Sequence, residues 1–571
     1  IFSGKLTGKF DDDPSGRLTA VLQLAGAEAS RLPGLPAAAG LSGPFSAKAT
    51  LEATGAAKGK PGPLSAVIEV DSPQLALWRA PDRQILAGPK AVLLLKGRDT
   101  PEGGDSIDLD ATLAVTATGA SGCRDIRLGA TGPLSLDKNG RLKELGQAKI
   151  EASALWRASE RSNKDVRVSL SGPLAVDVAG GGFSGGDLRF DAGGLSGKAK
   201  IWKKAGETGP AAFTLETGSL APRPILSAWG VSLPATLPAD RLAKAALSVS
   251  GTAGEEGLDL KRLALSVDDT NLTGRGSLPK YDFKRGKWDL NLDRLDWDTY
   301  SPHQPSSGPP PLAERRQPFD LKFLREQALD LRLAIGWLKA GNVTFDATTI
   351  QAGARGGLFT FRQESPHFYG GRFFAEIRGD ARDAALKTFV ELKLEGFECA
   401  HFLKDWAEGD TLSSGGATFI LAARTNGLNE EELRGNLAGN ASLQITRGDL
   451  KVHEPSAKPG DPPAERIPFD VFSSSWFAKN GVAHSDDFLI EGPRMRVAGK
   501  GFVDLRDETI NLAVTASLAG GSQVPATIIG PLDGPKLTID RSKILGDAVY
   551  RVLQGIVSIP GKAVTRILQI R

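Results

Sequence analysis

The sequence predicts a mainly β protein, an elongated, curled antiparallel sheet that forms a groove, with a few short helices and an amphipathic helix at its C-terminal end. Strict alternation of apolar and polar residues, the period of a strand with one apolar face, recurs along the 571 residues. The chain also has 68 Gly and 35 Pro, enough to separate many short strands by turns. Stretches with helical periodicity are few. Because this length exceeds what one hydrophobic core supports, we expect several lobes or one elongated architecture.

Five segments show the alternation most clearly, and each is predicted to be a strand with one face in water. They are residues 109–116, 288–293, 390–395, 441–446 and 510–518. Between such segments, Gly132-Pro133, Gly172-Pro173 and Gly530-Pro531 are predicted to reverse the chain between antiparallel strands.

Helical periodicity is predicted at two internal sites and at the C-terminal end. One internal helix contains Phe397, His401, Phe402 and Trp406, and the other, over 225–229, ends at Gly230. The third forms an apolar stripe within the basic tail 541–571. Its residues are Leu545, Ala548, Val549, Val552, Leu553 and Ile556. This stripe fits either an anionic membrane surface or a plug at the end of the sheet.

Composition narrows the classes of function. The net charge of +3 is too small for the positive field that nucleic-acid binding requires, so no nucleic-acid partner is expected. No window has the roughly 18 consecutive apolar residues of a spanning helix. Since the only methionine is Met495 and the chain starts at Ile1, we expect that a segment has been removed upstream. Cys123 and Cys399 are too far apart in sequence for a CxxC motif, and we do not expect them to pair.

Motifs that resemble catalytic or metal sites are better explained as turns. Residues 180–186 fit both GxGxxG and GxSxG, but both chemistries need a helix directly afterwards and an alternating strand follows instead. His484 with Asp486 and Asp487 is the best metal candidate, although a polar turn explains it better. Asp11, Asp12 and Asp13 lack the spaced ligands of a calcium loop, so a solvated turn is predicted. We predict no enzyme activity, no cofactor and no metal.

Several stretches resemble the AsmA family, and they occur in the order expected for that family. In the first half they are 222–226 with 237–242, 268–274 and 292–300. In the second half they are 369–371, 435–441, 447–450 and 530–535. Together they extend from about Pro222 to Asp540, whereas the preceding two hundred residues share only their β character with the family.

The resemblance implies a protein of the Gram-negative periplasm that is anchored to the inner membrane by an N-terminal helix, which this chain does not contain. It also implies kinship with bridge-like lipid transfer proteins and a role in outer-membrane lipid homeostasis, with phospholipid as the ligand. On this basis we divide the chain into an N-terminal β-rich region (1–300), a Pro/Ser-rich linker (301–318), a second β region (319–540) and the helical tail (541–571). A protein of the outer membrane or envelope is a further possible partner.

The sheet itself suggests how lipid would be held. A long sheet with one apolar face and few covering helices must bury that face against itself, another sheet or a ligand. If the sheet curls into an open groove, acyl chains can lie along its wall. A row of closed β-sandwiches remains the alternative. The candidate lipid contacts are Leu109, Leu113, Val115, Leu290, Leu292, Leu443, Ile445, Leu512 and Val514. The candidate membrane or plug contacts in the tail are Leu545, Val549, Val552, Leu553 and Ile556.

A second function is compatible with the same pattern. A periplasmic assembly or scaffolding factor would offer its β edges or apolar surface to outer-membrane proteins. The bound species, lipid or polypeptide, distinguishes the two functions.

Overall fold

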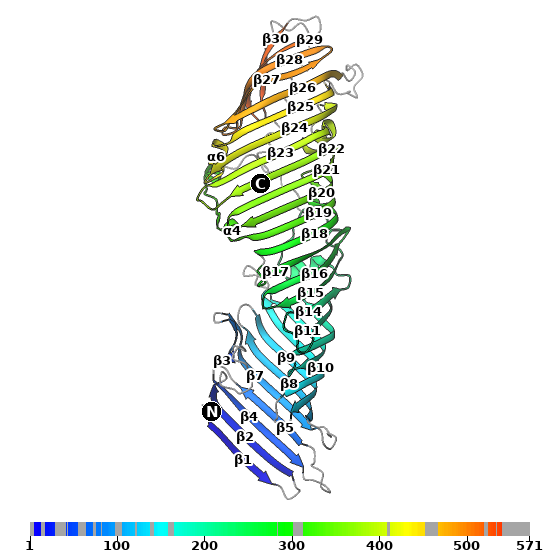
Figure 1. Ribbon diagram of the computed structural model, residues 1–571, viewed down its shortest axis with the longest axis vertical. Coiled ribbons are helices and arrows are strands. Elements are labelled where there is room, and N and C mark those ends of the chain that lie inside the picture. The colour runs from blue at the N-terminus through cyan, green and yellow to red at the C-terminus, as the bar shows by residue number, and fades with distance from the viewer. Residues whose placement is uncertain are drawn as a thin grey trace. The chain divides into compact units, whose positions relative to one another are not determined.

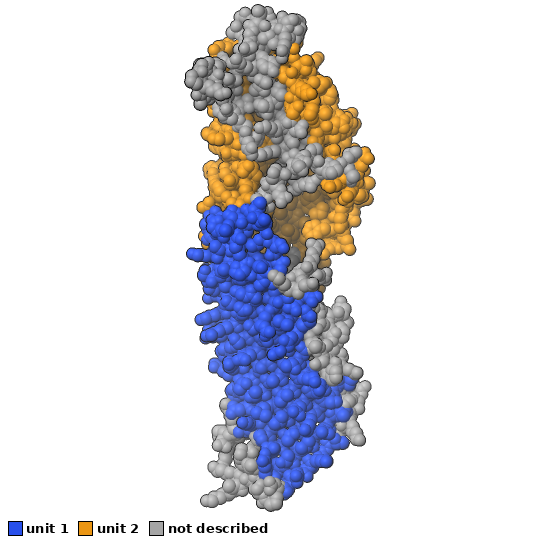
Figure 2. Space-filling view, turned by 180° about the vertical axis from the view of Figure 1, so that it is seen from behind, with its two compact units in different colours: residues 1–269 blue, residues 270–571 orange. Residues whose placement is uncertain are grey.

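The structure is a computed structural model, and it divides into two compact units, residues 1–269 and 270–571 (Figure 2). It describes residues 5–12, 17–28, 41–42, 44–54, 64–71, 76–80, 83–97, 106–119, 123–137, 142–157, 165–282, 284–300, 312–407, 412–451, 466–518, 523–532 and 534–539.

The first unit contains strands β1–β16 and helix α1 (Figure 1). Their bounds are β1 (Lys5–Asp12), β2 (Arg17–Glu28), β3 (Leu41–Ser42), β4 (Pro44–Thr54), β5 (Leu64–Asp71), β6 (Ala76–Ala80), β7 (Arg83–Gly97), β8 (Ser106–Gly119), β9 (Cys123–Asp137), β10 (Leu142–Arg157), β11 (Asp165–Asp177), β12 (Gly182–Ala192), β13 (Leu195–Lys203), β14 (Ala211–Thr217), α1 (Pro222–Ala228), β15 (Ala245–Gly254) and β16 (Gly257–Val267).

The second unit contains strands β17–β31 and helices α2–α6. Their bounds are β17 (Thr270–Pro279), β18 (Arg285–Asp296), α2 (Trp297–Tyr300), α3 (Leu312–Arg315), α4 (Lys322–Glu326), β19 (Ala328–Ala340), β20 (Val343–Arg355), β21 (Leu358–Phe368), β22 (Gly371–Asp380), β23 (Leu386–Glu398), α5 (Cys399–Ala407), β24 (Leu412–Gly427), α6 (Glu430–Gly435), β25 (Ala438–Lys451), β26 (Arg466–Lys479), β27 (Val482–Gly492), β28 (Met495–Asp504), β29 (Thr509–Leu518), β30 (Val524–Pro531) and β31 (Lys536–Ile539).

The strands confirm the predicted fold class, a mainly β chain whose antiparallel sheet is curled and does not close. In the first unit β1, β2, β4, β5 and β7 pair in that order, and β7–β16 follow as consecutive neighbours. The short β3 and β6 form a side ladder on β7. Among the pairings of the described strands, none joins the last strand of a unit back to its first.

One pairing in the second unit departs from the antiparallel pattern. Strands β18 and β19 are parallel, whereas the strands from β19 to β31 pair as consecutive antiparallel neighbours. A parallel pair requires a long return connection. That connection contains α2, α3 and α4, together with the whole segment predicted as a Pro/Ser-rich linker. Residues 301–311 of that segment lie outside the described residues, and α3 lies within its remainder.

The five alternating segments are all confirmed as strands, in β8, β18, β23, β25 and β29. Both internal helices are confirmed as well. Helix α5 contains His401, Phe402 and Trp406, whereas the predicted member Phe397 lies in the preceding strand β23. After the C-cap of α1, Trp229, comes Gly230, whose φ of 75° is the left-handed geometry that ends many helices.

The prediction that Gly-Pro pairs reverse the chain is wrong at two of three positions. Pro133 lies inside β9 and Pro173 inside β11, while Pro531 does end β30. Proline is tolerated there because the ladder is interrupted beside it. The register shifts between Leu145 and Lys149 opposite β9, and between Ser171 and Leu174 where β11 meets β12. At a bulge the regular ladder hydrogen bond is absent, so the backbone N–H that proline lacks is not needed there.

Three strands contain the same bulge, which breaks the alternation in the same way each time. A buried small residue is followed by two exposed residues and then by a buried large apolar residue. The register shifts at these segments are Gly185–Leu188 in β12, Ser365–Phe368 in β21 and Ser485–Phe488 in β27. Because a bulge bends its strand and increases the local right-handed twist, these repeats help to curl each unit.

Candidate functional site

A continuous apolar row crosses ten neighbouring strands of the first unit. Each residue is the direct cross-strand partner of the next, from β2 to β13. We call this row the first strip. It consists of Leu24, Ala47, Val70, Ala91, Val115, Leu128, Ala152, Leu170, Phe190 and Gly197. With strands about 4.8 Å apart, nine steps give a strip of about 43 Å.

The first strip is accessible as well as apolar. Every member is half-buried except Leu128, which is 37% exposed. A parallel row lies two residues further along the same strands, on the same face. It runs through Leu22, Ala49, Ile68, Leu93, Leu113, Ala130 and Ile150. We call the face with these two rows the apolar face.

The opposite face of the same strands is polar. The intervening row runs through Gln23, Lys48, Glu69, Val92, Ala114, Gly129, Glu151, Ser171 and Arg189. Its charged members are exposed. The two rows of the apolar face contain no charged residue, so the one-sided pattern predicted from alternation holds across the strands that the first strip crosses, β2 to β13.

The second unit has a comparable row of its own. We call it the second strip, and its members are direct partners from β18 to β26. It consists of Leu290, Leu333, Ile350, Gln363, Ala375, Leu392, Leu421, Ala441 and Trp476. All are half-buried, and Gln363 is the one polar member. The Nε2 of Gln363 donates to Thr348 Oγ1 at 3.4 Å, which partly satisfies its amide within the wall.

Beyond the second strip, the apolar face of β25–β30 is packed as a closed core. Ile445, Ile490, Leu512 and Ile528 are each 1% exposed or less. They belong to one contiguous cluster with the aromatic residues around α5. Side chains as buried as these cannot contact a ligand unless the packing opens, so this part of the wall differs physically from the first strip. The second strip borders it, because its members Leu333, Ile350, Leu392 and Trp476 pack against this core.

Helix α5 covers one end of this core. Phe402 contacts Phe368 and Phe397 with ring centroids 5.6 and 5.3 Å apart, and stacks on Trp406 at 5.1 Å. Tyr369 Oη donates to Asp405 Oδ2 at 2.7 Å. Burial and that hydrogen bond raise the pKa of Tyr369 to about 12, so it remains a neutral donor.

The predicted lipid contacts divide between the two environments. Leu113, Val115, Leu290, Leu292 and Leu443 are half-buried, and Val115 and Leu290 belong to the strips. Leu109, Ile445, Leu512 and Val514 are buried, at 6%, 1%, 1% and 3% exposed. The predicted contacts of the tail helix, Leu545, Val549, Val552, Leu553 and Ile556, lie outside the described residues.

Most of the strip residues were not singled out from the sequence. Leu24, Val70, Leu170 and Phe190 occur in ordinary alternating stretches, and only the register of distant strands aligns them. The signal that could have helped is residue size. Ala and Gly are frequent on the apolar face of the first unit, whereas Phe, Ile, Leu and Val fill the core of β25–β30.

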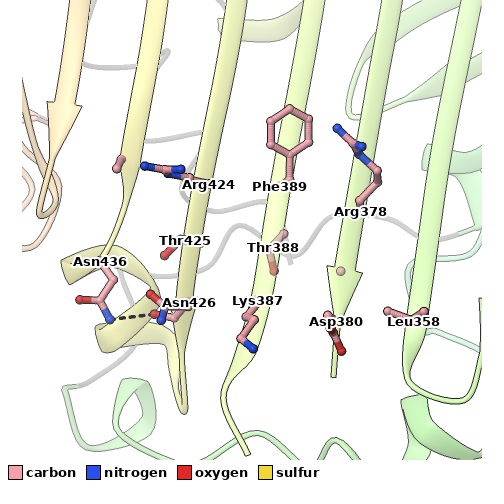
Figure 3. Close-up of a pocket in the computed structure, with 12 residues that line it drawn as sticks. Leu358, Arg378, Asp380, Lys387, Thr388, Phe389, Arg424, Thr425, Asn426 and Asn436 are labelled. Atoms are coloured by element: carbon pink, nitrogen blue, oxygen red, sulfur yellow. Dashed lines mark hydrogen bonds between the residues drawn. The ribbon is translucent and has the colours of Figure 1, made fainter. Parts of the chain in front are cut away.

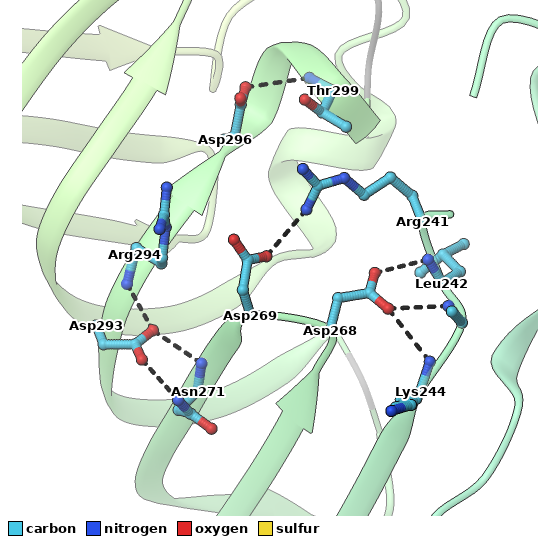
Figure 4. A network of polar contacts seen from close by, with 11 residues as sticks. Arg241, Leu242, Lys244, Asp268, Asp269, Asn271, Asp293, Arg294, Asp296 and Thr299 are labelled. Atoms are coloured by element: carbon cyan, nitrogen blue, oxygen red, sulfur yellow. Dashed lines mark hydrogen bonds and ion pairs between the residues drawn. The ribbon is translucent and has the colours of Figure 1, made fainter. Parts of the chain in front are cut away.

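Aspartates fix the turns where several of the family-like motifs lie (Figure 4). Asp268 accepts the N–H groups of Leu242, Ala243 and Lys244 at 2.6, 2.8 and 3.2 Å. In the second unit, Asp293 accepts the backbone and side-chain N–H groups of Asn271 at 2.8 and 2.7 Å. Slight burial raises the pKa of Asp293, but these hydrogen bonds outweigh it and hold the pKa below its ordinary value. At these positions the motifs stabilise local structure.

The motifs that resemble catalytic or metal sites lie mainly within strands. Residues 182–186 belong to β12, so no helix follows the glycine run. His484, Asp486 and Asp487 lie in β27, which corrects the predicted polar turn. They sit at the bulge, where Asp487 accepts the backbone N–H of Ser475 at 2.8 Å. Within the described ranges, no three His, Cys, Asp or Glu side chains cluster closely enough to hold a metal ion.

The remaining sequence candidates are placed as follows. Asp11 and Asp12 are exposed at the end of β1, and Asp13 lies outside the described residues. Cys399 is a free, buried thiol. None of the helices in the described part of the chain has the length and apolar character needed to cross a bilayer.

Comparison with known proteins identifies no relative of this chain. No protein-family model, curated protein or solved structure matches this chain.

Proposed function

We propose that this chain is a non-enzymatic phospholipid-handling protein that holds acyl chains along the first and second strips. The observation that carries the proposal is the first strip: ten strands wide, free of charge and only half-buried. An apolar surface of this extent exposed to water is costly, and soluble proteins that have one use it for binding.

The energetics favour hydrocarbon as the occupant. Burying one methylene group is worth about 0.8 kcal/mol, so a chain of about 16 carbons gains on the order of 10 kcal/mol before ordering costs. The hydrocarbon core of a bilayer is about 30 Å thick, so one leaflet contributes chains of about 15 Å. A strip of about 43 Å therefore has room for more than one acyl chain placed end to end. No specific polar contact is needed to hold them.

We further propose that the chain acts between the inner and outer membranes of a Gram-negative envelope and contributes to outer-membrane lipid homeostasis. The motifs that resemble the AsmA family support this setting. The fold supports the lipid-handling part of this proposal, because acyl chains can lie along the uncharged wall of a curled sheet.

The test is to introduce charge on the strip and ask whether bound lipid is lost. The variant Val70→Lys/Val115→Lys/Leu170→Lys places three cations on the first strip. The matched control, Val92→Lys/Ala114→Lys/Ser171→Lys, places three cations on the polar face of the same or the adjacent strands. Organic extracts of each purified protein are compared by mass spectrometry.

We expect phospholipid in extracts of the wild type and the control, and little in extracts of the strip variant, with circular dichroism unchanged in all three. Absence of phospholipid from the wild type, relative to an unrelated protein purified alongside, contradicts the proposal. Co-purification of a polypeptide in place of lipid supports the alternative of an assembly factor. The outermost strand β1 favours that alternative, because its Phe10 side chain is 74% exposed.

A further inference from the structure

A shallow depression of about 490 Å³ lies at one end of strands β21–β25. Arg378, Phe389 and Arg424 lie side by side on three neighbouring strands within it (Figure 3). They are direct cross-strand partners, so their side chains project from the same face. Phe389 faces away from the second strip, because Leu392, three residues along β23, belongs to the strip and alternate residues face opposite sides.

Small residues flank this trio and leave its side chains accessible. The next partners in the row are Thr360 on one side and Ala438 on the other. The guanidinium carbon of Arg378 lies 4.3 Å from the ring centroid of Phe389. This cation–π contact orients the Arg378 guanidinium over the ring.

The positive charge of the depression is incompletely compensated. Its lining includes three cations, Arg378, Lys387 and Arg424, and one carboxylate, Asp380. Asp380 is already engaged by Arg382, whose Nε and Nη2 donate to it at 2.9 and 2.7 Å. That bidentate pair holds the pKa of Asp380 below its ordinary value, so the group stays ionised and paired.

The other nearby carboxylates leave the two arginines partly available. Asp383 accepts from Lys387 Nζ at 2.6 Å, and Glu376 lies 3.5 Å from Arg378 Nε. No described residue forms a hydrogen bond or ion pair with the side chain of Arg424. Two guanidinium groups on either side of an aromatic ring, one of them without a partner, make a recognisable site for an oxyanion.

We infer that this depression binds a phosphate group, with Arg378 and Arg424 as its ligands and Phe389 as the platform between them. Asn426 and Asn436 line the same depression, where Asn436 Nδ2 already donates to the Asn426 carbonyl oxygen at 2.8 Å, and the Asn426 amide offers a further donor. The phosphate can belong to a lipid headgroup at a membrane surface or to a soluble phosphate. This site is separate from the strips and does not depend on the proposed function.

The experiment uses the full chain and two probes. Inorganic phosphate is titrated at low ionic strength by isothermal titration calorimetry, and flotation is measured with vesicles of phosphatidylglycerol or of phosphatidylcholine. The test variant is Arg378→Gln/Arg424→Gln. A matched control, Arg332→Gln, removes an exposed arginine from β19, outside the depression. Melting temperatures check that all variants are folded.

We expect the double variant to bind at least tenfold more weakly than the wild type and the control. If calorimetry shows this loss, the site takes soluble phosphate, and if only flotation on phosphatidylglycerol vesicles shows it, the site takes a headgroup. Arg424→Lys should retain part of the binding because it keeps the charge but not the fork of donors. The inference is overturned if neither probe binds the wild type, or if the double variant and the control lose binding equally.

Discussion

The contrast between the open strip and the closed core predicts very different costs for the same substitution at two leucines. Leu512 is 1% exposed and lies between its partners Gly501 and Ile528 on β28 and β30. Truncating a fully buried leucine to alanine removes its transfer energy and leaves a cavity, which costs about 2–5 kcal/mol. Leu113 is only half-buried on the open wall, so Leu113→Ala forfeits part of the roughly 1.5–3 kcal/mol of full burial, about 1 kcal/mol.

Urea unfolding of delipidated protein, followed by circular dichroism and by tryptophan fluorescence, measures both losses. The two probes are needed because units of a multidomain chain can unfold in separate transitions. Thr112→Ala, at an exposed position beside Leu113, is the control and should change stability by less than about 0.5 kcal/mol. Equal losses for Leu512→Ala and Leu113→Ala would refute the distinction between an accessible strip and a filled core.

Three further predictions concern polar and reactive groups. Arg434 is buried and donates to Glu430 at 2.7 Å and to Glu508 at 2.5 Å, so Arg434→Met should cost about 3 kcal/mol in urea unfolding, because it leaves Glu430 unpaired and Glu508 with only Arg315, 3.7 Å away. Hydrogen bonding to Arg506 holds the pKa of Asp504 below its ordinary value of 3.8. The stabilisation from this pair is therefore present above about pH 4 and is lost as the pH falls through the folded-state pKa. The melting temperatures of wild type and Asp504→Asn should converge in acid, and a constant difference between them would contradict this. Burial raises the pKa of Cys399 to about 12, so maleimide should modify this thiol only in urea. Peptide mass spectrometry measures the modification, and rapid labelling of the native protein would show that the core opens.

Local pattern was enough to predict the strands but not their partners. The alternation in 109–116 or 441–446 identifies which side chains share a face, because that depends on neighbours in the sequence. It does not reveal that Val115 lies in one row with Leu24 and Phe190, since that row depends on pairings accumulated over nine strands. The register of distant strands is therefore what the sequence alone could not supply.

The bulges were missed for a related reason. Alternation at Ser365 and Phe368 is interrupted by two exposed residues, and the same spacing recurs at Ser485 and Phe488. A short break in period resembles a turn, and so residues near His484 were predicted as one. The structure places them inside a continuous strand because the partner strand continues beyond the bulge.

Accessibility of the wall depends on side-chain volume more than on hydrophobicity. In the first strip the small residues Ala47, Ala91, Ala152 and Gly197 are interspersed among larger ones, so the sheet does not fill the space in front of its own apolar face. In β25–β30 a comparable backbone carries Phe472, Ile490, Val497 and other large side chains, which pack against one another and exclude a ligand. The first strip and the core of β25–β30 are equally apolar in sequence pattern, so hydrophobicity alone does not separate an open wall from a filled core. A search for lipid-contacting walls should therefore give weight to small residues at inward positions, because acyl chains can fill the volume that they leave.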